Sequence, residues 1–221
     1  MNEFIFFLQI SLLVLTISWF LRLGPEALIG LSAFLSICAN LFVLKQIEIL
    51  GWNCTCSDSF AIAVLLITNV LQRRFGSFIA TNGIIISFVA MMIFTMISQL
   101  HLWYRPSSFD TNHPHFFALL QPHPRILLAS LIAFLVSQCL ELRLTMWFQK
   151  FSKKISWKSQ AFLSISLSQA IDTMLFTILG LYQVVTNLTS VFLVSYSLKS
   201  ISLFIFTFLL GRLMPLFTKK T

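Results

Sequence analysis

The stretch ATNGIIISFVAMMIFTMISQLHLW, residues 80–103, decides the fold class because it contains no Asp, Glu, Lys or Arg. A helix needs about 20 consecutive apolar residues to cross the hydrocarbon core of a bilayer, so this stretch predicts a transmembrane helix. The rest of the chain is similar, since 57% of its 221 residues are hydrophobic and only 10% are charged. Soluble domains carry roughly 25% charged residues. The composition therefore excludes a soluble enzyme, a disordered chain and a disulfide-stapled scaffold.

Other apolar runs lie on both sides of this stretch, and the run at 60–72 is short for a span. The pair Gly24-Pro25 separates the first two runs. No basic residue precedes the first run, as one would in a signal peptide, so we interpret that run as a retained helix. The sequence predicts one all-α domain over residues 1–221, a polytopic transmembrane helix bundle. Its predicted spans are 4–21, 27–47, 60–72, 80–103, 126–148, 160–182 and 189–211.

The basic residues lie mainly on one side of this predicted topology. A polar turn at 51–59 and the longest loop, at 104–125, fall on one side, and a short basic loop at 149–159 falls on the other. Cytoplasmic loops carry the excess of Lys and Arg, so we expect the N-terminus outside and the C-terminus in the cytoplasm. The cytoplasmic set is Arg22, Arg73, Arg74, Lys150, Lys153, Lys154, Lys158, Arg212, Lys219 and Lys220, against Lys45, Arg105 and Arg125 outside.

Charged residues inside predicted spans are the strongest candidates for a site, because an ionisable group in the bilayer costs several kcal/mol. They are Glu141, Arg143, Asp172 and Lys199. Each acid ends a Ser-Gln-x-x-acid sequence, on consecutive spans of opposite direction. Within each helix the Ser, the Gln and the acid share one face. The match is short enough to arise by chance, but it predicts two polar faces that can converge.

Depth in the bilayer predicts which of these groups can meet. At about 1.5 Å per residue, Asp172 and Lys199 lie near the middle of their spans and can pair. Glu141 lies a turn or more closer to the cytoplasm, at the depth of Asn69. One interpretation is an acid-lined cavity between converging faces. The other is structural: Asp172 and Lys199 form an ion pair that fixes helix register, Glu141 and Arg143 extend to the cytoplasmic interface, and Asn69 bonds between helices.

Metal, cofactor and enzyme chemistry have no support in the sequence. The residues His101, His113, His115 and His123 lack zinc-ligand spacing, and Asp110 is the one carboxylate near them. No H-E-x-x-H, G-x-S-x-G or P-loop sequence is present. We therefore predict no metal, no cofactor, no enzymatic activity and no nucleic-acid partner, with the basic residues serving orientation in the lipid bilayer.

Several short motifs occur in a characteristic order along the chain. They are Asn40, Lys45 and Ile49-Leu50-Gly51; Ser59-Phe60, Thr68-Asn69 and Arg73-Arg74-Phe75-Gly76; Gln138 with Glu141; Ile171-Asp172-Thr173 with Phe176; and Tyr196 with Lys199. As an ordered set they resemble the queuosine precursor transporter family, also called vitamin-uptake-transporter-like. The chain departs from the family pattern at Asn69, where family members often have Asp, and at Glu141, where Asp is usual.

The resemblance implies both a fold and a function. It implies a six-helix core over residues 27–212, similar to the substrate-binding subunits of energy-coupling-factor importers, with residues 4–21 as an extra N-terminal helix. It also implies import of a 7-deazaguanine such as preQ0, preQ1 or queuine across a bacterial inner membrane, for salvage into the queuosine of tRNA. The alternative interpretation is that the protein is a non-transporting subunit of a membrane complex. The precursor carried, the energy source, and whether a homodimer or an energising partner is needed stay open.

The candidate substrate-binding residues suit a guanine-like ring. The two N–H donors on one edge of the ring can bond one carboxylate in parallel, and we assign that role to Asp172. Lys199 would keep Asp172 ionised, and Glu141 would neutralise a substrate amine. The ring's carbonyl edge and its faces would be contacted by further side chains, namely Asn69 and Gln138 through hydrogen bonds and Phe176 and Tyr196 through stacking.

Overall fold

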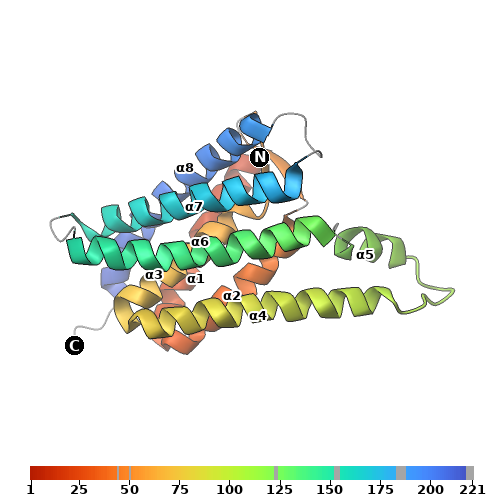
Figure 1. Ribbon diagram of the computed structural model, residues 1–221, viewed down its shortest axis with the longest axis horizontal. Helices are drawn as coiled ribbons and strands as arrows, with labels where there is room; N and C mark the ends of the chain where they lie inside the picture. Colours follow the sequence, from red (N-terminus) through yellow and green to blue (C-terminus); the bar gives the residue numbers. More distant parts are fainter. Residues whose placement is uncertain (44, 50, 122–123, 152–154, 183–187, 218–221) are drawn as a thin grey trace.

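A computed structural model describes residues 1–43, 45–49, 51–121, 124–151, 155–182 and 188–217 (Figure 1). The described residues form helices and one β-hairpin, so the all-α polytopic bundle predicted from the sequence is confirmed. The elements are α1 (Asn2–Leu23), α2 (Pro25–Phe42), β1 (Gln46–Ile49), β2 (Trp52–Thr55), α3 (Asp58–Phe75), α4 (Ser77–Leu102), α5 (His113–Leu120), α6 (Pro124–Phe151), α7 (Trp157–Leu181) and α8 (Leu188–Phe217).

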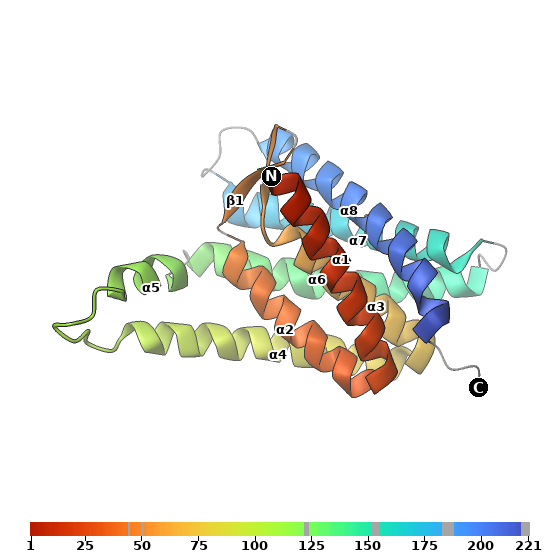
Figure 2. The same cartoon turned by 180° about the vertical axis from the view of Figure 1, so that it is seen from behind.

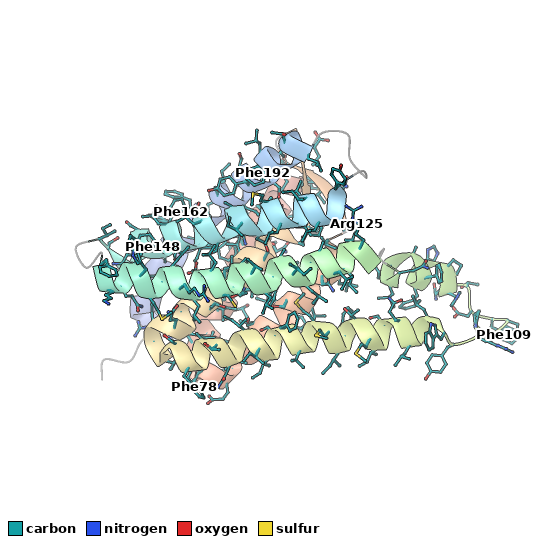
Figure 3. All side chains as sticks on the ribbon, viewed as in Figure 1. Phe78, Phe109, Arg125, Phe148, Phe162 and Phe192 are labelled. Atoms are coloured by element: carbon teal, nitrogen blue, oxygen red, sulfur yellow. The ribbon has the colours of Figure 1, made fainter. Side chains whose placement is uncertain are left out.

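Within the described residues, six helices are long and apolar enough to cross a membrane, namely α1, α2, α4, α6, α7 and α8. Their outer faces expose large apolar side chains, as expected where lipid is the solvent. Phe78 on α4, for example, is 76% exposed and points away from the bundle in Figure 3. Figure 2 shows α1 beside α8, and these two helices pack together.

The short run at 60–72 forms the centre of the bundle. It lies within α3, in which every residue from Ile62 to Gln72 is buried. Helices α1, α2, α4, α6, α7 and α8 all pack against α3. Because its neighbours separate it from lipid, α3 does not need the hydropathy of a lipid-facing span, and it can carry polar groups that bond to other helices.

The predicted span 27–47 is wrong at its C-terminal end. Helix α2 ends at Phe42, and residues 46–49 are paired with β2 in an antiparallel hairpin that also replaces part of the predicted polar turn at 51–59. In β1 the polar Gln46 and Glu48 alternate with isoleucines, which is a strand pattern. Gly51 has φ 77°, a value that glycine adopts easily, and it turns the chain between the strands.

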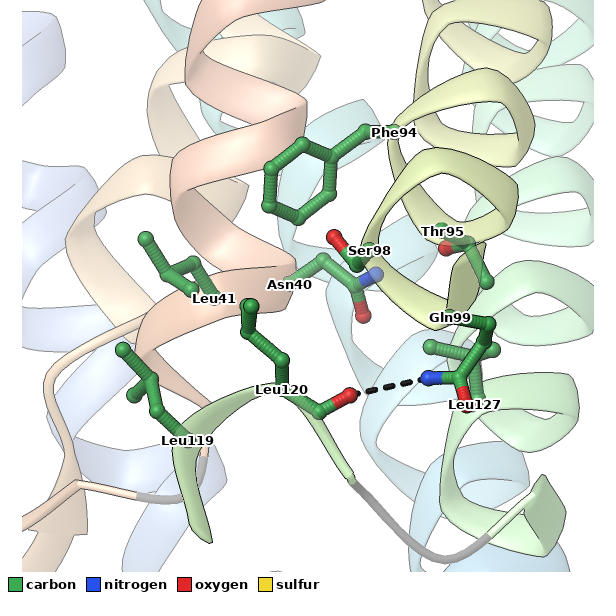
Figure 4. A pocket seen from close by; sticks show the side chains of 9 residues that line it. All are labelled: Asn40, Leu41, Phe94, Thr95, Ser98, Gln99, Leu119, Leu120 and Leu127. Atoms are coloured by element: carbon green, nitrogen blue, oxygen red, sulfur yellow. Dashed lines mark hydrogen bonds between the residues drawn. The ribbon is translucent and has the colours of Figure 1, made fainter. Parts of the chain in front are cut away.

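The long loop predicted at 104–125 contains a short helix. Helix α5 lies over the end of α4, where Gln99 Nε2 donates a 2.9 Å hydrogen bond to the carbonyl oxygen of Leu120 (Figure 4). A cavity of about 20 Å³ beneath α5 is lined in part by Asn40, Thr95 and Ser98. This volume suits a single water molecule and is far too small for a bicyclic ring.

Helices α6 and α7 pack as antiparallel neighbours along a seam of small residues. Thr145 lies against Ser164, with 3.4 Å between their hydroxyl oxygens. Toward the other end of the seam, a methyl group built on Gly180 would lie 3.4 Å from Cβ of Ala129. Small side chains allow helix backbones to approach closely in a membrane. Between these two points, the same seam carries Glu141 and Asp172.

A buried glycine at the junction of α2, α3 and α4 gives a test of this packing. A methyl group on Gly83 would lie 3.2 Å from Cδ1 of Leu71 and 3.4 Å from Cγ1 of Ile29. We expect Gly83→Leu to overpack the junction by about 1–3 kcal/mol and to lower the apparent Tm in detergent by about 3–10 °C. Gly30→Leu is the matched control, because nothing lies within 4 Å of its Cβ position. Equal Tm values for the two variants would contradict the packing.

Candidate functional site

Polar side chains from α3, α6, α7 and α8 meet inside the bundle in two groups. The first group, the lysine triad, consists of Asp58, Asp172 and Lys199. The second group, the Glu141 cage, consists of Glu141, Asn69, Thr145, Ser164 and Ser168. Both groups lie in the interior of the bundle, away from lipid. The charges in each group must therefore be paired or hydrogen-bonded within the protein.

In the lysine triad one ammonium group lies between two carboxylates. Lys199 Nζ is 3.3 Å from Asp172 Oδ2 and 3.6 Å from Asp58 Oδ1. It also donates to the hydroxyl oxygen of Thr173 at 3.1 Å. The side chains of Lys199 and Asp58 are 8% and 5% exposed, and that of Asp172 is 18% exposed. The pairing of Asp172 with Lys199 predicted from depth is thus confirmed.

Further contacts tie the triad to the neighbouring elements. Asp58 Oδ1 accepts a 3.0 Å hydrogen bond from the hydroxyl of Thr55, at the end of β2. Asp172 Oδ1 accepts a 3.3 Å bond from Ser137 on α6. The triad therefore joins the hairpin, α3, α6, α7 and α8.

The Glu141 cage surrounds one fully buried carboxylate with four donors from three helices. Glu141 Oε1 accepts from Asn69 Nδ2 at 2.7 Å, from Thr145 at 2.8 Å and from Ser164 at 2.9 Å. Glu141 Oε2 accepts from Ser168 at 3.1 Å. The expected shared depth of Asn69 and Glu141 is confirmed.

Arg73 connects this cage to the end of the bundle where α3 stops. Its Nε donates to Asn69 Oδ1 at 2.8 Å, and its terminal nitrogens lie 3.1 and 3.2 Å from Gln160 Oε1. The amide of Asn69 therefore bridges a guanidinium on one side and the Glu141 carboxylate on the other. From the sequence, Arg73 served for orientation and as part of a family motif, but not as a candidate site residue.

The two Ser-Gln-x-x-acid sequences exchange hydrogen bonds across the seam. Ser137, four residues before Glu141, donates to Asp172, and Ser168, four residues before Asp172, donates to Glu141. This crossed arrangement follows from the antiparallel packing of α6 and α7, which places the first residue of each motif opposite the acid of the other. The two predicted polar faces therefore do converge.

The other predicted site residues are Gln138, Phe176 and Tyr196, and each is at least partly buried. Gln138 is buried beside the cage and accepts a 2.6 Å bond from Thr68 on α3. Phe176 is half-buried one turn beyond Asp172 on α7. Tyr196 is also half-buried, its hydroxyl is 2.8 Å from that of Ser166, and its ring stacks on Phe192.

The interpretation that both Glu141 and Arg143 extend to the cytoplasmic interface is wrong for Glu141. Glu141 is fully buried, whereas Arg143 is exposed on the outer face of α6. Residues two apart on a helix point in different directions, so one can enter the bundle while the other faces out.

Asp58 is a member of the triad that sequence reasoning missed. It lies in the predicted polar turn and opens α3. An acid in the first turn of a helix is normally explained by the helix dipole. The sequence therefore gives no indication that Asp58 contacts Lys199, which lies far along the chain. Only the tertiary fold brings Asp58 to Lys199.

A polytopic helix bundle with ion pairs and polar cages in its interior has features of a membrane transporter, in which intramembrane charges mark binding sites and pathways. The chain belongs to the family described as "Putative vitamin uptake transporter", whose sequence profile matches residues 59–213. It is similar to a protein of Bacillus subtilis (strain 168) named "Probable queuosine precursor transporter". The two are 27% identical over 210 residues, which is 91% of each chain. No solved structure matches the chain.

The lysine triad predicts a large effect of removing its cation. Lys199→Met leaves two buried carboxylates without an ammonium group, and removing one partner of a buried pair costs about 3–5 kcal/mol. We expect a lower apparent Tm and less folded protein in detergent by size-exclusion chromatography. The double variant Lys199→Met/Asp172→Asn restores the net charge of the triad and should recover part of that loss. A double variant no more stable than Lys199→Met would contradict the charge argument.

Proposed function

We propose that this protein is an importer of queuosine precursors, 7-deazaguanines such as preQ0, preQ1 or queuine, in a bacterial inner membrane. The imported base would be salvaged into the queuosine of tRNA. The observation that carries the proposal is a carboxylate, Asp172, that is held inside a transporter bundle by two long hydrogen bonds. The family and the printed name of the Bacillus subtilis relative support the substrate class.

Asp172 is suited to exchange its present partners for a substrate. Its two oxygens each accept one donor at 3.3 Å, from Ser137 and from Lys199. These bonds are long compared with the 2.7–2.9 Å that is typical of charge-assisted bonds. The edge of a guanine-like ring offers two parallel N–H donors, so it can replace both partners at shorter distance. Lys199 would stay near, because Asp58 holds it on the other side.

The remaining candidate residues would contact other parts of the ring. Asn69 and Gln138 carry the amides that suit its carbonyl edge, and Phe176 and Tyr196 carry rings that suit its faces. In the described conformation Asn69, Gln138 and Tyr196 bond to protein partners. Substrate entry therefore requires α6, α7 and α8 to separate, as the helices of an alternating-access transporter do.

Orientation follows from the basic residues. Arg22, Arg73, Arg74 and Lys150 lie at the ends of α1, α3 and α6, which gather at one end of the bundle in Figures 1 and 2. The N-terminus, the hairpin and α5 lie toward the opposite end. We propose that the basic end faces the cytoplasm, so the hairpin and α5 face outward and import proceeds from the hairpin end to the Arg73 end.

The test uses a bacterium that can neither make nor import queuosine precursors. The chain is expressed there, preQ0, preQ1 or queuine is supplied separately, and queuosine is measured in tRNA, with a queuine-using tRNA transglycosylase supplied in parallel. We expect queuosine with at least one precursor. We expect Asp172→Asn to reduce it by about 100-fold or more, since a bidentate charged contact becomes a mismatched amide.

Asp110→Asn is the matched control for this experiment. Asp110 is an exposed aspartate that accepts backbone hydrogen bonds at the start of α5, and asparagine can accept the same bonds. It should leave queuosine formation unchanged. Full activity of Asp172→Asn, at equal amounts in the membrane, would contradict the proposed binding role. Absence of queuosine with every precursor would contradict the proposed import.

A further inference from the structure

The lysine triad has a net charge of one negative unit. Asp58 and Asp172 together carry two negative charges, and Lys199 supplies one positive charge. The other buried acid, Glu141, is matched by Arg73 through the amide of Asn69. Among the described residues of the interior, the surplus charge therefore lies at the triad, where low polarity makes an uncompensated charge unfavourable.

Asp58 is the member of the triad whose bonding is incomplete. The residue is 4% exposed. Its Oδ1 faces both Thr55 and Lys199, but its Oδ2 is buried with no hydrogen-bond partner among the described residues. Buried polar atoms are nearly always bonded in folded proteins, so a buried carboxylate oxygen without a donor indicates a place for one.

The position of Asp58 relates it to a substrate bound at Asp172. Lys199 lies between the two carboxylates, and Asp58 is beside the hairpin, at the end of the bundle that we propose faces outward. When a ring takes the place of Lys199 on Asp172, the ammonium group still has Asp58 Oδ1. Asp58 Oδ2 then remains for a donor that the substrate brings, and a positively charged donor also removes the surplus charge.

Glu141 is less suited to receive such a group. Its carboxylate already accepts four hydrogen bonds, and Arg73 balances its charge through Asn69. A substrate amine at Glu141 would have to displace at least one bonded hydroxyl or amide. At Asp58 it would bond to an oxygen that lacks a partner.

We propose that Asp58 is the binding site for a protonated amine of the substrate, and that it makes the protein prefer 7-deazaguanines with a cationic substituent over neutral ones. This inference rests on the proposed function and adds the chemical form of the substrate. It assigns to Asp58 the amine contact that the sequence alone assigns to Glu141.

The experiment compares substrates that differ in the charge of one substituent. Uptake by the full chain is measured with the 7-aminomethyl base, which is cationic at neutral pH, with the 7-hydroxymethyl base, which has nearly the same shape and no charge, and with the 7-cyano base. A charge-assisted bond in a buried site predicts a preference of about tenfold or more for the aminomethyl base over both neutral bases.

Asp58→Asn removes the surplus charge and should lower that preference, taken as the ratio of uptake of the cationic base to uptake of each neutral base, to about threefold or less. Glu48→Gln is the matched control, since it removes one negative charge from the exposed face of the hairpin at the same end of the bundle. It should leave the preference unchanged. Asp58→Glu keeps the charge and should keep a preference for the cationic base.

The outcomes separate this inference from the proposed function. Equal uptake of the aminomethyl and hydroxymethyl bases by the unaltered protein overturns the amine site and leaves import of 7-deazaguanines standing. An unchanged preference in a membrane-inserted Asp58→Asn variant also overturns it. If Asp58→Asn does not reach the membrane, the hydroxymethyl comparison in the unaltered protein decides. Uptake of none of the three bases contradicts the proposed function itself.

Discussion

The structure depends on one constraint: a carboxylate that is buried in a membrane must be bonded by the protein itself. Two carboxylates, Glu141 and Asp172, lie on the seam between α6 and α7, and each accepts a hydrogen bond from a serine hydroxyl of the other helix. Further donors come from α3 and α8, which bring Asn69 and Lys199. Burial of these acids therefore favours a position of α3 at the centre and of α8 against α7, since lipid cannot replace the missing partners.

The same arrangement links the two polar groups mechanically. Because Ser137 and Ser168 cross the seam in opposite directions, a separation of α6 from α7 breaks the bond to Asp172 and the bond to Glu141 together. A ring bound at Asp172 as proposed would therefore also loosen the Glu141 cage, and Arg73 and Gln160 extend from that cage to the other end of the bundle.

Much of this arrangement could be predicted from the sequence, and the remainder could not for definite reasons. Apolar runs predicted the six long helices, and counting residues along each span placed Asp172 with Lys199 and Asn69 with Glu141, because depth in a bilayer is nearly a one-dimensional quantity. The hairpin was missed because apolar residues as far as Ile47 extended the predicted span past the true end of α2. Asp58 was missed because its role depends on the lateral order of the helices, on which hydropathy carries no information.

The two departures of this chain from the family pattern, Asn69 and Glu141, are hydrogen-bonded to each other. Asn69 donates to Glu141 through Nδ2 and accepts from Arg73 through Oδ1, a double role that an amide can fill and an ionised carboxylate cannot. Aspartate at the same position would keep the contact with Arg73 but would place a second negative charge beside Glu141, and that pair would need a proton to be stable. With asparagine, the cage is balanced by Arg73 alone. Among the described interior residues one unbalanced charge then remains, at the lysine triad, and this is the charge that the proposed substrate amine would balance.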